Sequence, residues 1–188
     1  GINNGEVMLS KQKLPPEHMA MMYNMADCTI NMADAEGFGL ATLESLATET
    51  PILVTMTGGL QEQVTELKEV NEEMMLKRNK KSKKVTKYKH GIGIEPTSKS
   101  VIGSQDVPYI YEDRINQRDF IKALEMIYNM SADERAALGK AGRAHVLKNY
   151  NFETYTKRWD EIMMFVYNKH GSWENRKNYS SYSFKEIV

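Results

Sequence analysis

Two acidic residues, Glu36 and Glu44, stand eight positions apart on either side of a turn that contains two glycines. The turn reads Glu36-Gly37-Phe38-Gly39, and the stretch from Leu40 to about Thr48 after it favours a helix. Glycine lets the backbone approach a ligand closely or adopt a positive φ. The first amides of a helix lack intrahelical partners, and together with the helix dipole they favour an anion such as phosphate.

The two carboxylates suit hydroxyl groups on either side of such an anion. Glu44 lies about 6 Å along the helix axis from Leu40, and its side chain tilts back toward the helix start. Glu36, at the end of the preceding strand, can reach hydroxyls from the other side. The pair therefore fits a ligand with sugars on both sides of a pyrophosphate. Spacing alone leaves an alternative open, in which Glu36 caps a turn and Glu44 is a solvated acid that improves the helix dipole.

The elements around this turn predict a βαβ unit. A short apolar run, Cys28–Met32, indicates a buried strand, and Leu40, Leu43, Leu46 and Ala47 give the helix an apolar stripe. A second apolar run, Pro51–Val54, precedes a second glycine turn, Thr57-Gly58-Gly59. Strand, helix and strand in this order favour parallel strands, and ligands of such sheets bind at the carboxyl ends of the strands, where both glycine turns fall.

The rest of the chain supplies further elements before and after this unit. We expect a short strand at Glu6–Leu9, a helix after Pro15-Pro16, and a strand at Gly91–Glu95. Turn residues predict a loop over Thr97–Gln105, and Val107–Tyr111 is predicted to be extended. Three helices then close the chain, with apolar stripes on the first and last, a Ser131/Glu134 capping box on the second and Asn151 as a cap of the third.

Charge is concentrated in one segment of an otherwise neutral chain. Lys plus Arg and Asp plus Glu each number 25 in 188 residues, so net charge indicates no acidic partner and makes nucleic acid an unexpected one. Residues Lys77–Lys89 nevertheless hold eight basic residues and no acid. We expect this basic insertion, about residues 76–90, to be solvated and mobile, with an anionic acceptor or a membrane surface as the functional alternative.

Cysteine and histidine point to neither disulfides nor metal. The lone cysteine, Cys28, excludes an intrachain disulfide and favours a reducing, cytoplasmic compartment. No metal-ligand spacing and no cofactor motif is present, so we predict neither. No apolar run is long enough for a transmembrane segment.

The residues from about Ala26 to Val64 resemble the donor-binding signature of glycosyltransferase family 4, retaining enzymes of the GT-B fold. The resemblance rests on Glu36-Gly37-Phe38-Gly39-Leu40, Leu43-Glu44-Ser45-Leu46-Ala47, Thr50-Pro51 and Gly58-Gly59 followed by Glu62, and includes the family's E-x7-E motif. It implies that Glu36, the candidate catalytic residue, contacts the transferred sugar and that Glu44 holds the ribose. The candidate donor-binding set is then Gly37, Phe38, Gly39, Leu40, Glu44, Gly58 and Gly59.

The resemblance implies an α/β fold: a Rossmann-like parallel sheet flanked by helices, the C-terminal half of a GT-B enzyme, incomplete at its N-terminus. Residues 1–170 would form the donor-binding domain and residues 171–188 a polar tail. The implied reaction transfers a glycosyl group from a nucleotide-diphosphate sugar to an unknown acceptor (glycan, lipid or other) with retention. Since the acceptor domain would lie N-terminal to Gly1, we expect this chain alone to be an inactive fragment. A sugar-nucleotide epimerase and a non-catalytic sugar-nucleotide-binding or interaction module remain the alternatives.

Overall fold

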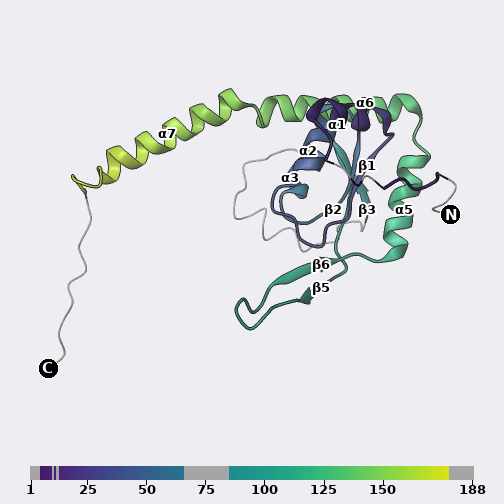
Figure 1. The fold of residues 1–188 in the computed structure, drawn as a ribbon, viewed down its shortest axis with the longest axis horizontal. Coiled ribbons are helices and arrows are strands. Elements are labelled where there is room, and N and C mark those ends of the chain that lie inside the picture. The colour runs from purple at the N-terminus through teal and green to yellow at the C-terminus, as the bar shows by residue number, and fades with distance from the viewer. Residues whose placement is uncertain (1–4, 10, 12, 66–84, 178–188) are drawn as a thin grey trace. The chain divides into compact units, whose positions relative to one another are not determined.

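The computed structural model describes residues 5–9, 11, 13–65 and 85–177. The chain divides into two compact units, residues 1–147 and residues 148–188 (Figure 1). The basic residues at positions 77–84 lie outside the described part, as do residues 178–188 of the predicted tail.

The first unit contains a four-stranded sheet with the order β1-β2-β4-β3. Strands β1 (Thr29–Asn31), β2 (Ile52–Thr55) and β4 (Gly91–Ile94) are parallel, and β3 (Val85–Lys87) pairs antiparallel to β4. The βαβ prediction is confirmed, since β1 and β2 pair in parallel with Ile30 opposite Leu53.

Helices cover both faces of this sheet, so the predicted α/β fold is confirmed. Figure 1 shows α2 (Leu40–Ala47) and α3 (Leu60–Val64) on one side of the strands and α5 (Gln117–Tyr128) on the other. Successive side chains of β2 point to opposite faces of the sheet, so this strand packs against both helix layers. Leu53 packs in the cluster that contains Ala123 and Ile127 of α5, whereas Ile52 and Val54 pack with side chains of α2 and α3.

The edges of the sheet and the segment before it differ from the predictions. Residues Glu6–Leu9 are not a strand, and Val7, Met8 and Leu9 are exposed, because among the described strands none lies beside them. Strand β1 forms at the predicted place but lies at the sheet edge, where Ile30 is 46% exposed rather than buried.

The predicted basic insertion ends in ordered structure, which corrects part of that prediction. Val85, 4% exposed, belongs to the apolar cluster under α5, and Tyr88 Oη donates a hydrogen bond to Glu95 Oε1 at 3.1 Å. One apolar side chain in the core and pairing with β4 are enough to fix residues 85–87 despite the basic residues around them.

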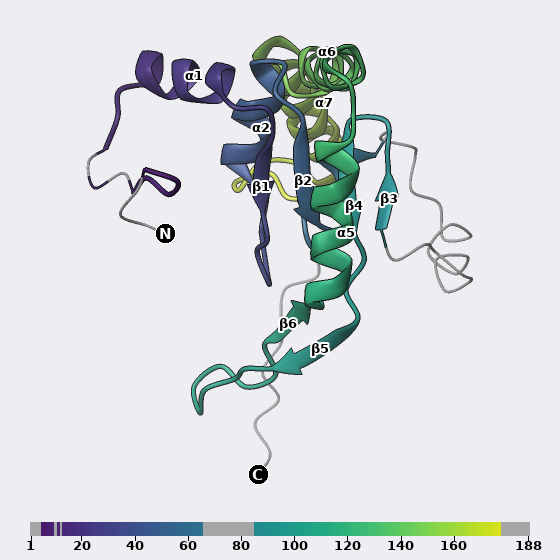
Figure 2. The same cartoon turned by 90° about the vertical axis from the view of Figure 1, so that its right-hand side faces the viewer.

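A second sheet replaces the loop predicted for Thr97–Gln105. It is a hairpin of β5 (Ser98–Val101) and β6 (Tyr111–Arg114), which Figure 2 shows extending beyond the end of the main sheet. Only the last residue of the predicted extended segment Val107–Tyr111 is in a strand. The strand β5 was missed because cross-strand pairing holds it, as between Lys99 and Asp113 (Nζ to Oδ1, 3.6 Å), rather than an apolar pattern.

The remaining helices of the first unit begin as predicted. Helix α1 (Pro16–Met25) follows Pro15, and α6 (Ala132–Asn149) starts at the predicted capping box, in which Glu134 N donates to Ser131 Oγ and Ser131 N donates to Glu134 Oε2. Its His145 ring stacks on His90, with centroids 4.2 Å apart, and both rings are buried.

The second unit consists, in its described part, of α7 (Phe152–His170) and a short segment to residue 177. Thr154 N donates to Asn151 Oδ1 at 2.7 Å, which confirms the predicted cap. None of the side chains of α7 is buried, including its predicted apolar stripe. Among the described residues, no helix has both the length and the hydropathy needed to cross a bilayer.

Candidate functional site

The two predicted glycine turns, residues 36–39 and 57–59, pack directly against each other through their backbones. We call them the glycine-turn pair. Gly59 N donates to Gly37 O at 3.2 Å. A Cβ at Gly58, whose φ is +45°, would lie 1.6 Å from Glu36 O, and one at Gly59 would lie 2.7 Å from Phe38 O. Only glycine therefore fits positions 58 and 59 without moving the backbone of the first turn.

Gly39 joins the first turn to α2. Its φ of +87° lies in the left-handed region, and a Cβ there would meet Leu60 Cδ2 at 2.5 Å and Thr42 Oγ1 at 2.8 Å. Its carbonyl oxygen accepts hydrogen bonds from Leu43 N at 3.1 Å and Thr42 Oγ1 at 2.9 Å. These contacts fix the residue at which α2 begins, and with it the position of the first free amides of the helix.

Gln63 of α3 completes the packing behind the first turn and was not foreseen. Its side chain is fully buried, and Nε2 donates to Phe38 O at 2.6 Å and to Gly39 O at 2.9 Å. No local pattern identifies such a residue, because its partners lie 24 and 25 positions earlier in the chain.

The opposite side of the first turn is open to solvent. A Cβ added at Gly37 would have no heavy atom within 4 Å, Phe38 is 41% exposed and Glu36 is half-buried. Leu40, at the first position of α2, is 68% exposed, so its predicted place in the apolar stripe is wrong. The buried face of α2 is instead formed by Thr42, Ser45 and Leu46, and Leu40 lies on roughly the opposite side of the helix from Thr42.

Glu44 is exposed on the second turn of α2 and contacts α1 rather than the glycine-turn pair. Tyr23 Oη donates a hydrogen bond to Glu44 Oε2 at 3.0 Å. Burial, the hydrogen bond to Glu44 and the negative charge of that carboxylate raise the pKa of Tyr23 to about 12. The phenol therefore remains a donor at neutral pH and orients one carboxylate oxygen, which leaves the other oxygen of Glu44 for a further donor.

The β5–β6 hairpin is tied to the segment just before Glu36. Asp113 N donates to Asp34 O at 2.8 Å, and Arg114 makes a short ion pair with Asp34. Arg114 also contacts Glu112 (Nη2 to Oε2, 2.8 Å) and Ser100 (Nε to Oγ, 2.8 Å). The hydrogen bond to Asp34 is the main cause that raises the pKa of Arg114. The hairpin thus borders the predicted site without contributing a predicted site residue.

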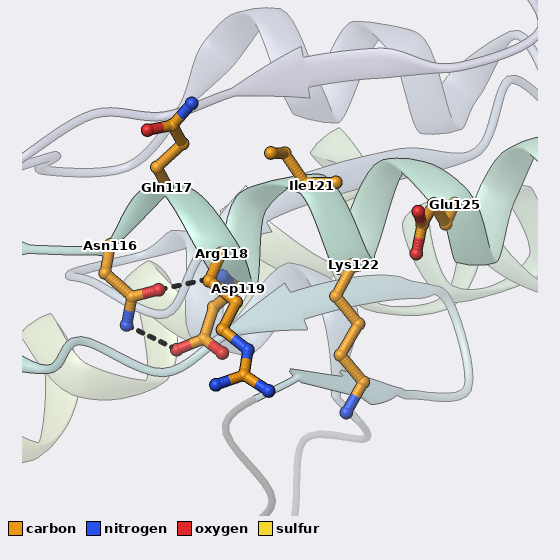
Figure 3. Close-up of a pocket in the computed structure, with 7 residues that line it drawn as sticks. All are labelled: Asn116, Gln117, Arg118, Asp119, Ile121, Lys122 and Glu125. Carbon is orange, nitrogen blue, oxygen red and sulfur yellow. Dashed lines mark hydrogen bonds between the residues drawn. The ribbon is translucent and has the colours of Figure 1, made fainter.

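A separate surface hollow lies along α5 and contains none of the predicted site residues (Figure 3). Within it Asp119 is buried and bonds Asn116 twice, through Asn116 Nδ2 to Asp119 Oδ2 at 2.7 Å and Asp119 N to Asn116 Oδ1 at 2.8 Å. These bonds cap the helix start. Because the lining comes from one helix and its polar pair is satisfied within that helix, the hollow has a structural explanation.

Metal-binding side chains do not gather around the glycine-turn pair. Across the described ranges, no three His, Cys, Asp or Glu side chains group as ligands of one ion would. Burial, with a smaller contribution from Asp27, raises the pKa of the Cys28 thiol to about 12, which disfavours the thiolate at neutral pH.

Comparison with known proteins identifies the family that the first part of the chain resembles. Residues 3–87 match the family described as glycosyl transferases group 1, and this range includes every predicted site residue. D-inositol 3-phosphate glycosyltransferase from Corynebacterium urealyticum is 44% identical over 52 residues, which are 28% of this chain and 12% of the relative.

Sucrose-phosphate synthase from Thermosynechococcus elongatus aligns with a TM-score of 0.49 at 21% identity, over 81% of this chain and 28% of its own. The chain therefore spans only a small part of the length of the proteins that it matches. By sequence, residues 3–87, less than half of the chain, are similar to the glycosyl transferases group 1 family.

Proposed function

We propose that this chain supplies the donor-binding part of a retaining glycosyltransferase of family 4, which takes a glycosyl group from a nucleotide-diphosphate sugar. The observation that carries the proposal is the glycine-turn pair, in which the open side of residues 36–39 lies beside the start of α2. The pair falls within residues 3–87, which match the family. Backbone amides at a helix start suit a diphosphate and stabilise charge that develops on it as it leaves.

Each predicted residue has a role in this proposal. The backbone of Gly37, Phe38, Gly39 and Leu40 approaches the diphosphate, and Gly58 and Gly59 support that backbone from behind. Glu44, already held at one oxygen by Tyr23, accepts hydrogen bonds from the ribose hydroxyls. Glu36, half-buried at the mouth of the turn, contacts hydroxyls of the transferred sugar and is the catalytic candidate.

The roles of Glu36 and Glu44 can be distinguished by titration calorimetry of the 188-residue chain with UDP, GDP and ADP and their glucose conjugates. Glu44→Gln removes charge-assisted hydrogen bonds to the ribose, each worth about 1.5–3 kcal/mol. Affinity for the preferred diphosphate should fall about tenfold or more, whether or not a sugar is attached. Glu36→Gln should leave binding of the bare diphosphate unchanged and weaken only binding of the sugar conjugate.

Glu17→Gln provides the matched control, because it removes the same charge from an exposed acid in the first turn of α1. It should change neither affinity. If Glu36→Gln and Glu44→Gln bind both ligands as the parent does and only shift the melting temperature slightly, the acids have the turn-capping roles and the proposal is wrong.

For the chain as it stands, we propose donor binding without sugar transfer, with acceptor binding supplied by other parts of a longer enzyme. Positioning two substrates together contributes much of the rate in group transfer. Transfer of sugar to a glycan or lipid acceptor by the purified 188 residues would contradict this part of the proposal.

A further inference from the structure

Gln63 is a buried polar residue that the proposed roles do not use. It lies on α3, directly behind the first glycine turn, and the other buried residues of this helix, Leu60 and Val64, are apolar. Both groups that face its Nε2 are carbonyl oxygens, those of Phe38 and Gly39, so the side chain must present its NH₂ group to them. This requirement fixes the orientation of the amide.

That orientation leaves the other end of the side chain without a partner. Within the described part of the chain, Gln63 Oε1 is buried and accepts no hydrogen bond. A buried, unpaired carbonyl oxygen costs free energy, and an apolar side chain would avoid that cost in these surroundings. The two bonds to the turn are therefore the contribution of Gln63 that an apolar residue cannot replace.

The two bonds restrain the part of the backbone whose amides matter for anion binding. Gly39 O receives three donors, Gln63 Nε2, Thr42 Oγ1 and Leu43 N, while the bond to Phe38 O, at 2.6 Å, restrains the preceding peptide. Each carbonyl belongs to the same peptide plane as the amide of the following residue. Fixing the carbonyls of Phe38 and Gly39 thus fixes the directions of the amides of Gly39 and Leu40.

We propose that Gln63 is a positioning residue, which aims the Gly39 and Leu40 amides at the diphosphate of the donor. This inference rests on the proposed donor-binding function and extends it to a side chain that need not touch the ligand. Preorganised amides bind an anion without a further cost of ordering the loop.

Gln63→Met tests the proposal, because it keeps the length and burial of the side chain and removes both bonds. Calorimetry with UDP, GDP and ADP should show the affinity of the preferred diphosphate lowered about tenfold, as expected for lost hydrogen bonds that preorganise a site. Hydrogen exchange without ligand should show faster exchange at residues 39–41. Gln61→Met is the matched control, since Gln61 Nε2 makes only a longer, exposed bond to Gly58 O at 3.3 Å.

Gln63→Glu gives a readout that a purely packing role would not move. When the carboxyl group of this variant is protonated, its single O–H can donate to one of the turn carbonyls, whereas the ionised carboxylate repels both. The diphosphate affinity of the variant, taken relative to the parent at the same pH, should be low at about pH 8 and recover toward the parent at about pH 5, nearer the ordinary pKa of a glutamate. Because protonation also removes the burial cost of the carboxylate, the discriminating result is an affinity at about pH 5 that exceeds that of Gln63→Met, which packs without the bonds. A packing role predicts equal affinities for these two variants at that pH.

The outcomes separate this inference from the function on which it rests. A parent chain that binds none of the three diphosphates overturns the proposed function and the positioning role together. A parent that binds, with Gln63→Met folded and equal in affinity, overturns the positioning role alone. Faster exchange at residues 39–41 with unchanged affinity does the same, because it shows a structural restraint that binding does not use.

Discussion

The glycine-turn pair and the β5–β6 hairpin both follow strands that end at the carboxyl edge of the main sheet. The glycine-turn pair is held by backbone packed on backbone, with Gln63 buried behind it. The hairpin is held to the same edge by one main-chain bond, Asp113 N to Asp34 O, and by the partly exposed ion pair between Arg114 and Asp34. The first arrangement leaves no room for a side chain at positions 58 and 59, whereas the second exchanges its contacts with water at little cost.

The largest effect is expected when one methyl group is added to the glycine-turn pair, where backbone packs on backbone. Gly58→Ala should destabilise the chain by roughly 3 kcal/mol, because the new Cβ would overlap Glu36 O and the φ of +45° disfavours alanine. For a chain of this size the melting temperature would fall by about 6–12 °C. Thermal unfolding followed by circular dichroism measures this shift.

Gly37→Ala is the matched control on the facing turn. Its Cβ would have nothing within 4 Å, and its φ lies outside the left-handed region, so the change should stay within about 0.5 kcal/mol. Equal shifts for the two variants would show that the turns do not pack as described.

The sequence predicted the parts of this region that depend on local signals. The helix α2, the strand β2 and both glycine turns lie where apolar runs and glycines placed them. Contacts between distant residues could not be predicted in this way. Gln63 and Tyr23 bond Gly39 and Glu44 from 24 and 21 positions away, and β5 depends on its pairing with β6.

A similar limit explains an error close to the site. Residue type predicts Leu40 in the apolar stripe, whereas the buried face of α2 includes the polar residues Thr42 and Ser45. Ser45 Oγ is satisfied there, at 2.8 Å from Thr29 Oγ1 and 3.1 Å from Thr50 O. Hydrogen bonds to Thr29 on β1 and to the nearby carbonyls of Gly39 and Thr50 thus make this polar helix face suitable for burial.

In its degree of burial, the contact between Tyr23 and Glu44 is intermediate between the glycine-turn pair and the hairpin contacts, because a buried phenol meets an exposed carboxylate. Glu44→Gln removes the negative charge, so the pKa of Tyr23 should fall from about 12 and remain above its ordinary value of 10.0 because the burial persists. The Cζ chemical shift of labelled tyrosine, followed against pH, measures it, with Tyr23→Phe identifying the resonance.

The raised pKa of Tyr23 also determines how the stability of the fold changes with pH. A pKa raised in the folded state stabilises the fold fully below the pH at which the unfolded tyrosine ionises, and this contribution is lost as pH rises from about 10 to 12. Relative to Tyr23→Phe, the parent should therefore lose stability across that window. A stability difference that stays constant from about pH 9 to pH 11 would contradict the raised pKa of Tyr23 and the part-buried hydrogen bond to Glu44.

The smallest effect is expected at the hairpin, where Arg114→Gln removes the ion pairs with Asp34 and Glu112. The partners are partly exposed, and the main-chain bonds Asp113 N to Asp34 O and Thr97 N to Arg114 O do not involve the side chain. Stability should fall slightly at low salt, and the difference from the parent should vanish at high salt because ions screen exposed charges. Affinity for the preferred nucleoside diphosphate should stay unchanged, in contrast to Gln63→Met. If Arg114→Gln weakens that affinity as strongly as Gln63→Met does, the hairpin helps to position residues 34–39, and the contrast between the two regions does not hold.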